Sequence, residues 1–108
     1  MTTGEIRKKL ELEVICESAP EKEVKGCYCS DLLSHCMSNI SDGNVWITVQ
    51  TNINIAAIAV LTDLGCIIIA QDMPIEDDVV SKAHAEKINI YRSKKTAYEL
   101  CVEVGKLI

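Results

Sequence analysis

Clusters of basic residues and glycine-rich phosphate loops are the features that this sequence most clearly lacks. Its 108 residues include 11 Lys and Arg against 16 Asp and Glu, which gives a net charge of −5. Because nucleic acids reward clustered positive charge, we expect no nucleic-acid partner. The sequence also has no G-x-x-x-x-G-K-S/T loop, so P-loop kinase chemistry is not expected.

Long hydrophobic runs are also missing, and we expect no secretion signal at the N-terminus. The longest uninterrupted apolar run is residues 55–61, whereas a bilayer span needs about 20 apolar residues. The first ten residues, MTTGEIRKKL, contain no apolar stretch with a small-residue cleavage site. We therefore expect a cytoplasmic protein without a membrane partner. In that reducing compartment, most of the six cysteines should be thiols.

The composition predicts a single domain over residues 1–108. Apolar residues make up 48% of the chain, which is enough for one core at this length. In the N-terminal part, apolar residues four apart predict a helix over 5–10, and alternation in LEVICES predicts a strand with one wet face. A short β-like stretch covers 24–28. Ser30 or Asp31 is then placed to cap a helix that ends near residue 38.

From residue 45 onwards, one strand-then-helix pattern occurs three times. The predicted strands are 45–50, 66–70 and 88–91, and the predicted helices are 53–64, 76–86 and 94–106. The strand CIII is apolar on both faces, which is typical of a parallel sheet covered on both sides. The sequence therefore predicts an α/β fold, with a mainly parallel sheet and helices on both faces. We expect Gly65 to end the first of these helices, and Pro74 with the acidic residues after it to begin the second.

The central helix is apolar on every side between residues 55 and 61. Such a helix should be buried on most sides, and one layer of sheet does not cover it completely. Either flanking helices or a second subunit must cover the rest. For a domain this small we favour a homodimer.

Two stretches, YCSDLLSHCMSNI and GNVWITVQTNINIAAIAVLTDLGCIIIAQDMPIEDDVVSKAHAEKINIYRSKKTAYEL, resemble the DRTGG-domain family. The resemblance covers about residues 24–108 and is closest to the short stand-alone members. It implies a small α/β domain similar to the N-terminal domains of HPr kinase/phosphorylase and of the MurF ligases, and related to the DRTGG domain of phosphotransacetylases. The short members are often encoded near iron-only hydrogenases, which implies a link to redox or fermentative metabolism. The kinase chemistry of HPr kinase lies in a separate P-loop domain, so the resemblance implies no enzymatic activity.

The sequence departs from the family signature at two corners. The family has an Asp-Arg pair at the first strand-to-helix corner, where this chain has Gln50 and Thr51. It has a Gly-Gly pair after the next strand, where this chain has Gln71 and Asp72. The cationic and glycine features that could cradle an anion are therefore absent.

The polar residues of these corners form the candidate ligand site, which comprises Gln50, Thr51, Asn52, Gln71 and Asp72. In a parallel sheet both corners lie at the carboxyl ends of adjacent strands, where α/β sheets bind ligands. A second interpretation stays open, because Thr51 or Asn52 could simply cap the helix that begins near residue 53. Without a phosphate loop, a neutral or amide-bearing ligand is favoured over a nucleotide phosphate.

Cysteine and histidine supply an alternative site. Cys27, Cys29, His35 and Cys36 are residue types that hold zinc or iron–sulfur clusters, although they lack the usual C-x-x-C spacing. Because cysteine is commonly buried, core filling explains these positions better. No motif pairs a nucleophile with a base, so a dyad of Cys36 with a distant histidine is not expected.

The sequence therefore predicts a non-enzymatic regulatory or ligand-sensing module with no cofactor and no metal. Its expected partners are a second copy of itself and a small polar ligand or another protein. The alternative function is a metal or iron–sulfur accessory protein that uses Cys27, Cys29 and Cys36.

Overall fold

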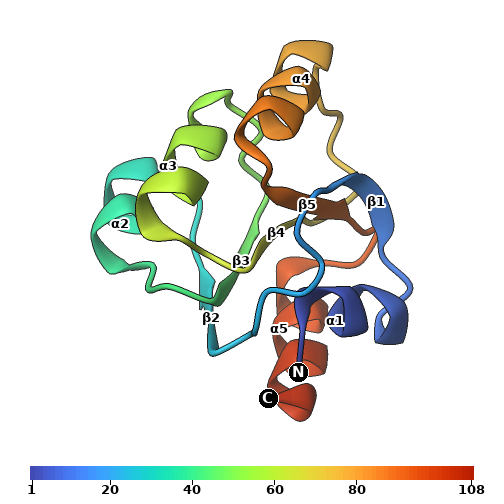
Figure 1. The fold of residues 1–108 in the computed structure, drawn as a ribbon. Helices are drawn as coiled ribbons and strands as arrows, with labels where there is room; N and C mark the ends of the chain where they lie inside the picture. The colour runs from blue at the N-terminus through green and yellow to red at the C-terminus, as the bar shows by residue number, and fades with distance from the viewer.

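The computed structural model describes residues 1–108 as one five-stranded sheet with five surrounding helices (Figure 1). The strands are β1 (Glu13–Glu17), β2 (Gly26–Cys29), β3 (Asn44–Thr48), β4 (Cys66–Ile69) and β5 (Asn89–Arg92). The helices are α1 (Thr3–Lys9), α2 (Leu33–Asn39), α3 (Asn54–Thr62), α4 (Asp77–Glu86) and α5 (Ala97–Leu107). The strand order is β1-β5-β4-β3-β2, and only β1 runs antiparallel to its neighbour. The predicted α/β fold, with a mainly parallel sheet, is confirmed.

The side chains of the central strands alternate between two apolar cores, one on each face of the sheet. On β3, Trp46 points into one core, whereas Val45 and Ile47 point into the other. Helices α2, α3 and α4 cover the core that contains Trp46, and helices α1 and α5 cover the opposite core (Figure 1). Because both faces of β3 and β4 are buried, these strands need apolar residues at successive positions.

The three predicted strand–helix units are all present. Each strand and helix begins and ends within three residues of its predicted bounds. The acidic start predicted for α4 is also confirmed, since Asp77 and Asp78 occupy the first turn. Negative charge there complements the positive end of the helix dipole.

The start of α2 differs from the prediction. The residue before the helix is Leu32, which makes no side-chain capping bond, so neither Ser30 nor Asp31 caps the helix. The Asp31 carboxylate instead accepts hydrogen bonds from the Thr48 hydroxyl at 2.7 Å and from the Val49 N–H at 2.8 Å. Asp31 therefore secures the carboxyl end of β3.

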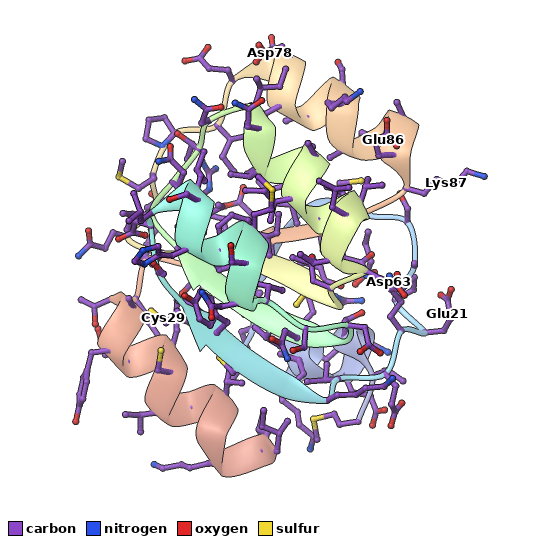
Figure 2. The ribbon with its side chains drawn as sticks, turned by 90° about the vertical axis from the view of Figure 1, so that its left-hand side faces the viewer. Glu21, Cys29, Asp63, Asp78, Glu86 and Lys87 are labelled. Atoms are coloured by element: carbon purple, nitrogen blue, oxygen red, sulfur yellow. The ribbon has the colours of Figure 1, made fainter.

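The helix ends also differ from the prediction, because residues other than glycine take the left-handed conformation. Helix α3 ends at Asp63 with a φ of 52°, and α4 ends in the same way at Lys87 with a φ of 57° (Figure 2). Gly65 is not the cap. A Cβ at Gly65 would lie 3.0 Å from the Thr3 methyl group, so close packing accounts for glycine at that position.

A buried asparagine joins the N-terminal segment to the sheet. The Asn89 amide nitrogen donates to the Ala19 carbonyl at 2.7 Å, the Gly65 carbonyl at 2.9 Å and the Thr3 hydroxyl at 3.2 Å. Its amide oxygen accepts from the Ala19 N–H at 2.9 Å. Since Asn89 is completely buried, these bonds satisfy polar groups that water does not reach.

Helix α3 is apolar on every side but only partly covered. Its buried side chains are Ile55, Ala56, Ile58 and Ala59. Val60 and Leu61, however, are 47% and 70% exposed. The sheet and the neighbouring helices therefore leave an apolar side of α3 open to solvent. No helix of the protein, α3 included, is long and apolar enough to cross a membrane.

Candidate functional site

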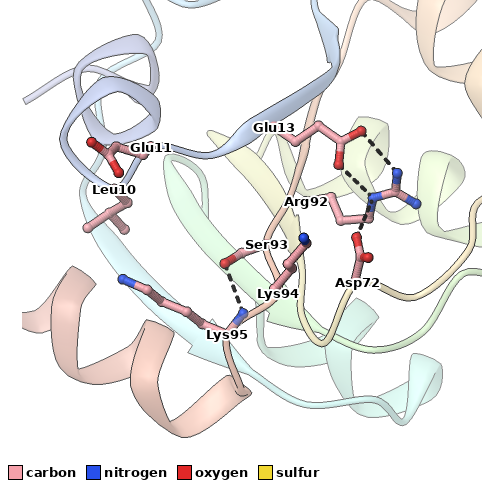
Figure 3. Close-up of a pocket in the computed structure, with 8 residues that line it drawn as sticks. All are labelled: Leu10, Glu11, Glu13, Asp72, Arg92, Ser93, Lys94 and Lys95. Carbon is pink, nitrogen blue, oxygen red and sulfur yellow. Dashed lines mark hydrogen bonds and ion pairs between the residues drawn. The ribbon is translucent and has the colours of Figure 1, made fainter.

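A polar cavity of about 290 Å³ opens at the edge where β4 and β5 end (Figure 3). It is lined by Leu10, Glu11, Glu13, Asp72, Arg92, Ser93, Lys94 and Lys95. Three chain segments meet there, because antiparallel β1 starts at the edge where parallel β5 ends. In open α/β sheets this edge is the usual place for a ligand.

The turn after β4 supplies Asp72 and has an unusual backbone. Gln71 and Asp72 have φ angles of 59° and 53°, and the Met73 N–H donates to the Ala70 carbonyl at 3.4 Å. Two successive positive φ angles closed by such a bond describe a type I′ turn, which strongly prefers glycine or asparagine. The family's Gly-Gly pair would fit this backbone without strain, whereas Gln71 and Asp72 hold it at a conformational cost.

Arg92, the last residue of β5, fixes one wall of the cavity. Its guanidinium donates two parallel hydrogen bonds of 2.9 Å to the Glu13 carboxylate and a third, of 3.1 Å, to the Met73 carbonyl. The Asp72 carboxylate lies 3.4 Å from the same group (Figure 3). The hydrogen bonds from Arg92 lower the pKa of Glu13. These contacts hold the end of β5 against the start of β1 and the turn after β4.

The opposite wall contains two lysines, Lys94 and Lys95, and only Lys95 forms an ion pair. The Lys95 ammonium donates to Glu103 of α5 at 2.6 Å, and this hydrogen bond raises the pKa of Lys95. Lys94 makes no ion pair or side-chain hydrogen bond, and neither does the Glu11 carboxylate. The cavity therefore contains one cation and one anion without a hydrogen-bonded partner, although Lys94 acts on Glu13, and Glu11 on Lys95, through longer-range electrostatics.

The corner after β3 is occupied with local hydrogen bonds. The Gln50 amide nitrogen donates to the Asp31 carbonyl at 3.4 Å, and its amide oxygen accepts from the Asn52 N–H at 3.1 Å. The Asn52 side chain accepts from the Asn54 N–H at 2.8 Å in the turn before α3, whereas the cap residue itself is Ile53, whose side chain makes no capping bond. Thr51 makes no side-chain hydrogen bond within the protein and lines no cavity.

The five residues of the predicted ligand site thus do not share one cavity. Only Asp72 lines the polar cavity, and Gln71 shapes its turn from just outside. Gln50, Thr51 and Asn52 line none of the four cavities. Neither Thr51 nor Asn52 is the cap residue of α3, which is Ile53, but the Asn52 side chain does accept a hydrogen bond from the first residue of that helix.

The residues of the metal alternative are not brought together as a ligand set. Cys27 and Cys29 lie on the side of β2 that α5 covers, beside Cys101 (Figure 2), whereas Cys36 is buried in the core on the opposite face. No group of three or more His, Cys, Asp or Glu side chains is arranged to hold a metal ion. Cys27 and Cys29 are exposed, so the prediction that they fill the core is wrong for both. Partial desolvation beside Cys101 still raises the pKa of Cys27 to about 12 and that of Cys29 to about 11. His35 is exposed on α2.

A thiol and an imidazole do meet elsewhere, between β1 and α4. The Cys16 sulfur lies 3.5 Å from His84 Nδ1 and 3.3 Å from the Ser18 hydroxyl. Cys16 is only 1% exposed and lines no cavity, so a substrate would not reach its sulfur. Cys36 contacts no histidine in this way, since its thiol donates to the Ser30 carbonyl at 3.5 Å.

Most of the cavity residues were not among the predicted site residues. The missed residues are Leu10, Glu11, Glu13, Arg92, Ser93, Lys94 and Lys95. One signal was available, since the three basic residues of RSKK lie where a predicted strand gives way to a predicted helix. The acidic wall gave no such signal, because nothing in the sequence places residues 11–13 beside residues 92–95.

The order of strands and helices gives the protein a DRTGG/CBS-like α/β fold. Among solved structures, it is similar to the CBS and DRTGG domains of the regulatory region of a pyrophosphatase from Clostridium perfringens, which was crystallised with its activator, diadenosine tetraphosphate. The TM-score is 0.69 at 15% sequence identity, over 94% of this chain and 46% of that one, so this chain spans less than half of the other. No protein-family model and no curated protein matches the sequence. At this identity the similarity shows the fold alone.

Proposed function

We propose that the protein is a non-enzymatic regulatory module that senses a small polar ligand. The observation that carries this proposal is the cavity of about 290 Å³ around Asp72, at the edge of the sheet where ligands of α/β proteins bind. The strained turn at Gln71 and Asp72 supports it, because such strain often accompanies function. Asp72 is therefore the predicted site residue on which the proposal rests.

The chemistry of the cavity favours binding over catalysis. Neither histidine nor cysteine lines it, and the hydroxyl of Ser93 already accepts a hydrogen bond from the Lys95 N–H at 3.1 Å. A nucleophile needs a base within hydrogen-bond reach, and Ser93 has no such partner. The charged groups are suited to hold and orient a polar molecule.

The structural neighbour adds support for a regulatory role. It is described as the regulatory region of an enzyme, bound to a nucleotide activator. The present cavity does not suit a nucleotide, because its lining has only one hydrophobic residue, Leu10, against which a base could pack. The proposed link to redox or fermentative metabolism has no support beyond the sequence resemblance.

The uncovered side of α3 supports the further proposal of a homodimer. Two grooves flank this helix, one of about 310 Å³ beside α2 and one of about 300 Å³ beside α4, and both are lined by Ala57 and Leu61. In a symmetric dimer, the exposed Leu61 of one copy can pack beside the small Ala57 of the other copy. The ion pair of Lys82 and Glu86, at 3.1 Å, gives the groove beside α4 a polar rim.

The ligand proposal is tested by a thermal-shift screen of central metabolites and nucleotides. We expect at least one compound to raise the melting temperature of the wild type and to lose that effect in Asp72→Ala. Gln50→Ala should retain the shift, because Gln50 lies outside the cavity, and Asp78→Ala on α4 serves as a matched exposed control. If no compound stabilises the wild type, or if Asp72→Ala responds normally, the proposal fails.

The homodimer is tested by light scattering over a range of protein concentrations. We expect a dimer for the wild type and a monomer for Leu61→Glu, which should fold because Leu61 is 70% exposed. Tyr98→Glu is the matched control, since Tyr98 is 77% exposed on α5, away from α3. A wild-type protein that stays monomeric at every concentration would refute the dimer.

A further inference from the structure

The charges of the cavity are balanced, which is unusual in a protein with a net charge of −5. The cationic lining residues are Arg92, Lys94 and Lys95, and the anionic ones are Glu11, Glu13 and Asp72. Two of the cations are used internally, since Arg92 is held by Glu13 and Lys95 by Glu103. The ammonium of Lys94 and the carboxylate of Glu11 remain for a ligand, and Asp72 keeps one oxygen away from Arg92.

The size and polarity of the cavity limit what it can hold. About 290 Å³ corresponds to roughly ten water molecules at about 30 Å³ each. It lies just below the volumes of about 300–1,000 Å³ that are common for ligand sites, which are mostly apolar. With Leu10 as its single hydrophobic lining residue, the cavity suits a small and highly charged molecule better than an aromatic one.

The walls are held in place by backbone hydrogen bonds. The Gln71 N–H donates to the Lys95 carbonyl at 2.9 Å, and the Asp72 N–H donates to the Ser93 carbonyl at 2.8 Å. The loop that carries Lys94 is thereby joined to the strained turn that carries Asp72 (Figure 3). A site that is fixed before binding loses less entropy when the ligand arrives.

The carboxylate side is also fixed. Glu11 takes a φ of 52° directly after α1, and the Leu12 N–H donates back to the Arg7 carbonyl at 3.0 Å. The Glu11 N–H donates to the Lys8 carbonyl at 3.3 Å. These two bonds form the Schellman motif that ends α1, so the backbone position of Glu11 is set by the helix.

From these observations we infer that the ligand is a small zwitterion, such as an amino acid, whose anionic group binds Lys94 and whose cationic group binds Glu11. The inference rests on the proposed ligand-sensing function and names its ligand class. A dicarboxylate or a polyphosphate would need at least two free cations, and the cavity offers only Lys94. A lone cation would leave Lys94 unpaired beside it.

The test uses ligands of one chain length that differ only in charge. The probes are 4-aminobutyrate and 2-aminobutyrate as zwitterions, butyrate as the anion, butylamine as the cation and succinate as the dianion, with inorganic phosphate and pyrophosphate added. Binding is measured by calorimetry on the full chain. We expect a zwitterion to bind at least about 10-fold more tightly than any other probe, because it alone makes charge-assisted bonds at both ends.

Variants then locate the two ends of the ligand. Lys94→Gln and Glu11→Gln should each weaken zwitterion binding by at least about 10-fold, because each replaces one charged partner with a neutral amide. The matched controls are Lys106→Gln and Glu21→Gln, which are exposed and line no cavity. They should bind as the wild type does, and circular dichroism checks that all four variants fold.

The outcomes separate this inference from the proposed function. If succinate or a phosphate binds as tightly as the best zwitterion, or if Lys94→Gln and Glu11→Gln bind normally, the zwitterion is refuted. If no zwitterion binds but another metabolite loses its thermal shift in Asp72→Ala, the inference fails and the sensing function stands. If no compound of either set binds, both fail.

Discussion

The strained turn at Gln71 and Asp72 should respond to glycine in a way that ordinary positions do not. A residue other than glycine in the left-handed conformation costs about 1–2 kcal/mol, whereas glycine loses about 0.5–1 kcal/mol of additional backbone entropy on folding. The Gln71 side chain is exposed and makes no hydrogen bond, so its removal loses nothing. We therefore expect Gln71→Gly to increase the free energy of unfolding by about 0.5–1 kcal/mol.

Urea denaturation followed by circular dichroism measures this change. The midpoint should rise while the slope stays constant, because the folded and unfolded surfaces are nearly unchanged. The matched control is Ala85→Gly, an exposed position inside α4, which should lose about 1 kcal/mol. If Gln71→Gly is as destabilising as Ala85→Gly, the turn is not strained and this support for a functional site is lost.

Three further predictions concern buried polar groups and thiols. Asn89→Ala should lower the free energy of unfolding, measured by urea titration, by about 2–4 kcal/mol, because its buried hydrogen-bond partners remain unpaired. The control Asn39→Ala, at an exposed position, should lose less than about 0.5 kcal/mol. Equal losses in the two variants would contradict this prediction. Hydrogen bonds from Arg7 lower the pKa of Glu17 in the folded state, so ionised Glu17 stabilises the fold above the ordinary glutamate pKa, and this stability is lost as the pH falls through the lowered pKa. Glu17→Gln should therefore lose less stability than the wild type when the free energy of unfolding is measured from pH 6 to 3. An equal pH dependence in both proteins would refute this prediction. Cys27 and Cys29 are exposed, but partial desolvation raises their pKa values to about 12 and about 11. We therefore expect both to react with iodoacetamide at pH 7.5 more than about 10-fold slower than free cysteine, as peptide mass mapping would show; modification at the rate of free cysteine would contradict this.

The sheet and its helices could be predicted from the sequence because burial leaves a simple pattern. A strand covered on both faces must be apolar at every position, and β4 with its four buried residues shows this directly. The helix ends could not be predicted in the same way. Glycine is the usual signal for a left-handed cap, and this chain uses Glu11, Asp63 and Lys87 there instead.

The candidate site was only partly predictable, and the reason lies in the topology. Asp72 follows a recognisable strand, so its place at the carboxyl edge could be inferred from the chain alone. The opposite wall comes from Glu11 and Glu13, near the N-terminus and outside the stretch that resembles the DRTGG family. These residues reach the cavity only because β1 adds to the sheet antiparallel to β5, a pairing that local periodicity does not reveal.

The segment after Asp72 links the cavity directly to α4, which borders the proposed dimer surface. Residues 73–76 lead directly into α4, whose Lys82 and Glu86 line the groove beside α3. A ligand that binds Asp72 would therefore also restrain the start of α4. Ligand binding and dimerisation would then be linked. If dimerisation changes the affinity for the ligand by some factor, the ligand changes the dissociation constant of the dimer by the same factor. We expect a change of about 5-fold or more, measured by light scattering with and without saturating ligand. A dissociation constant that the ligand leaves unchanged would mean that the cavity does not regulate assembly.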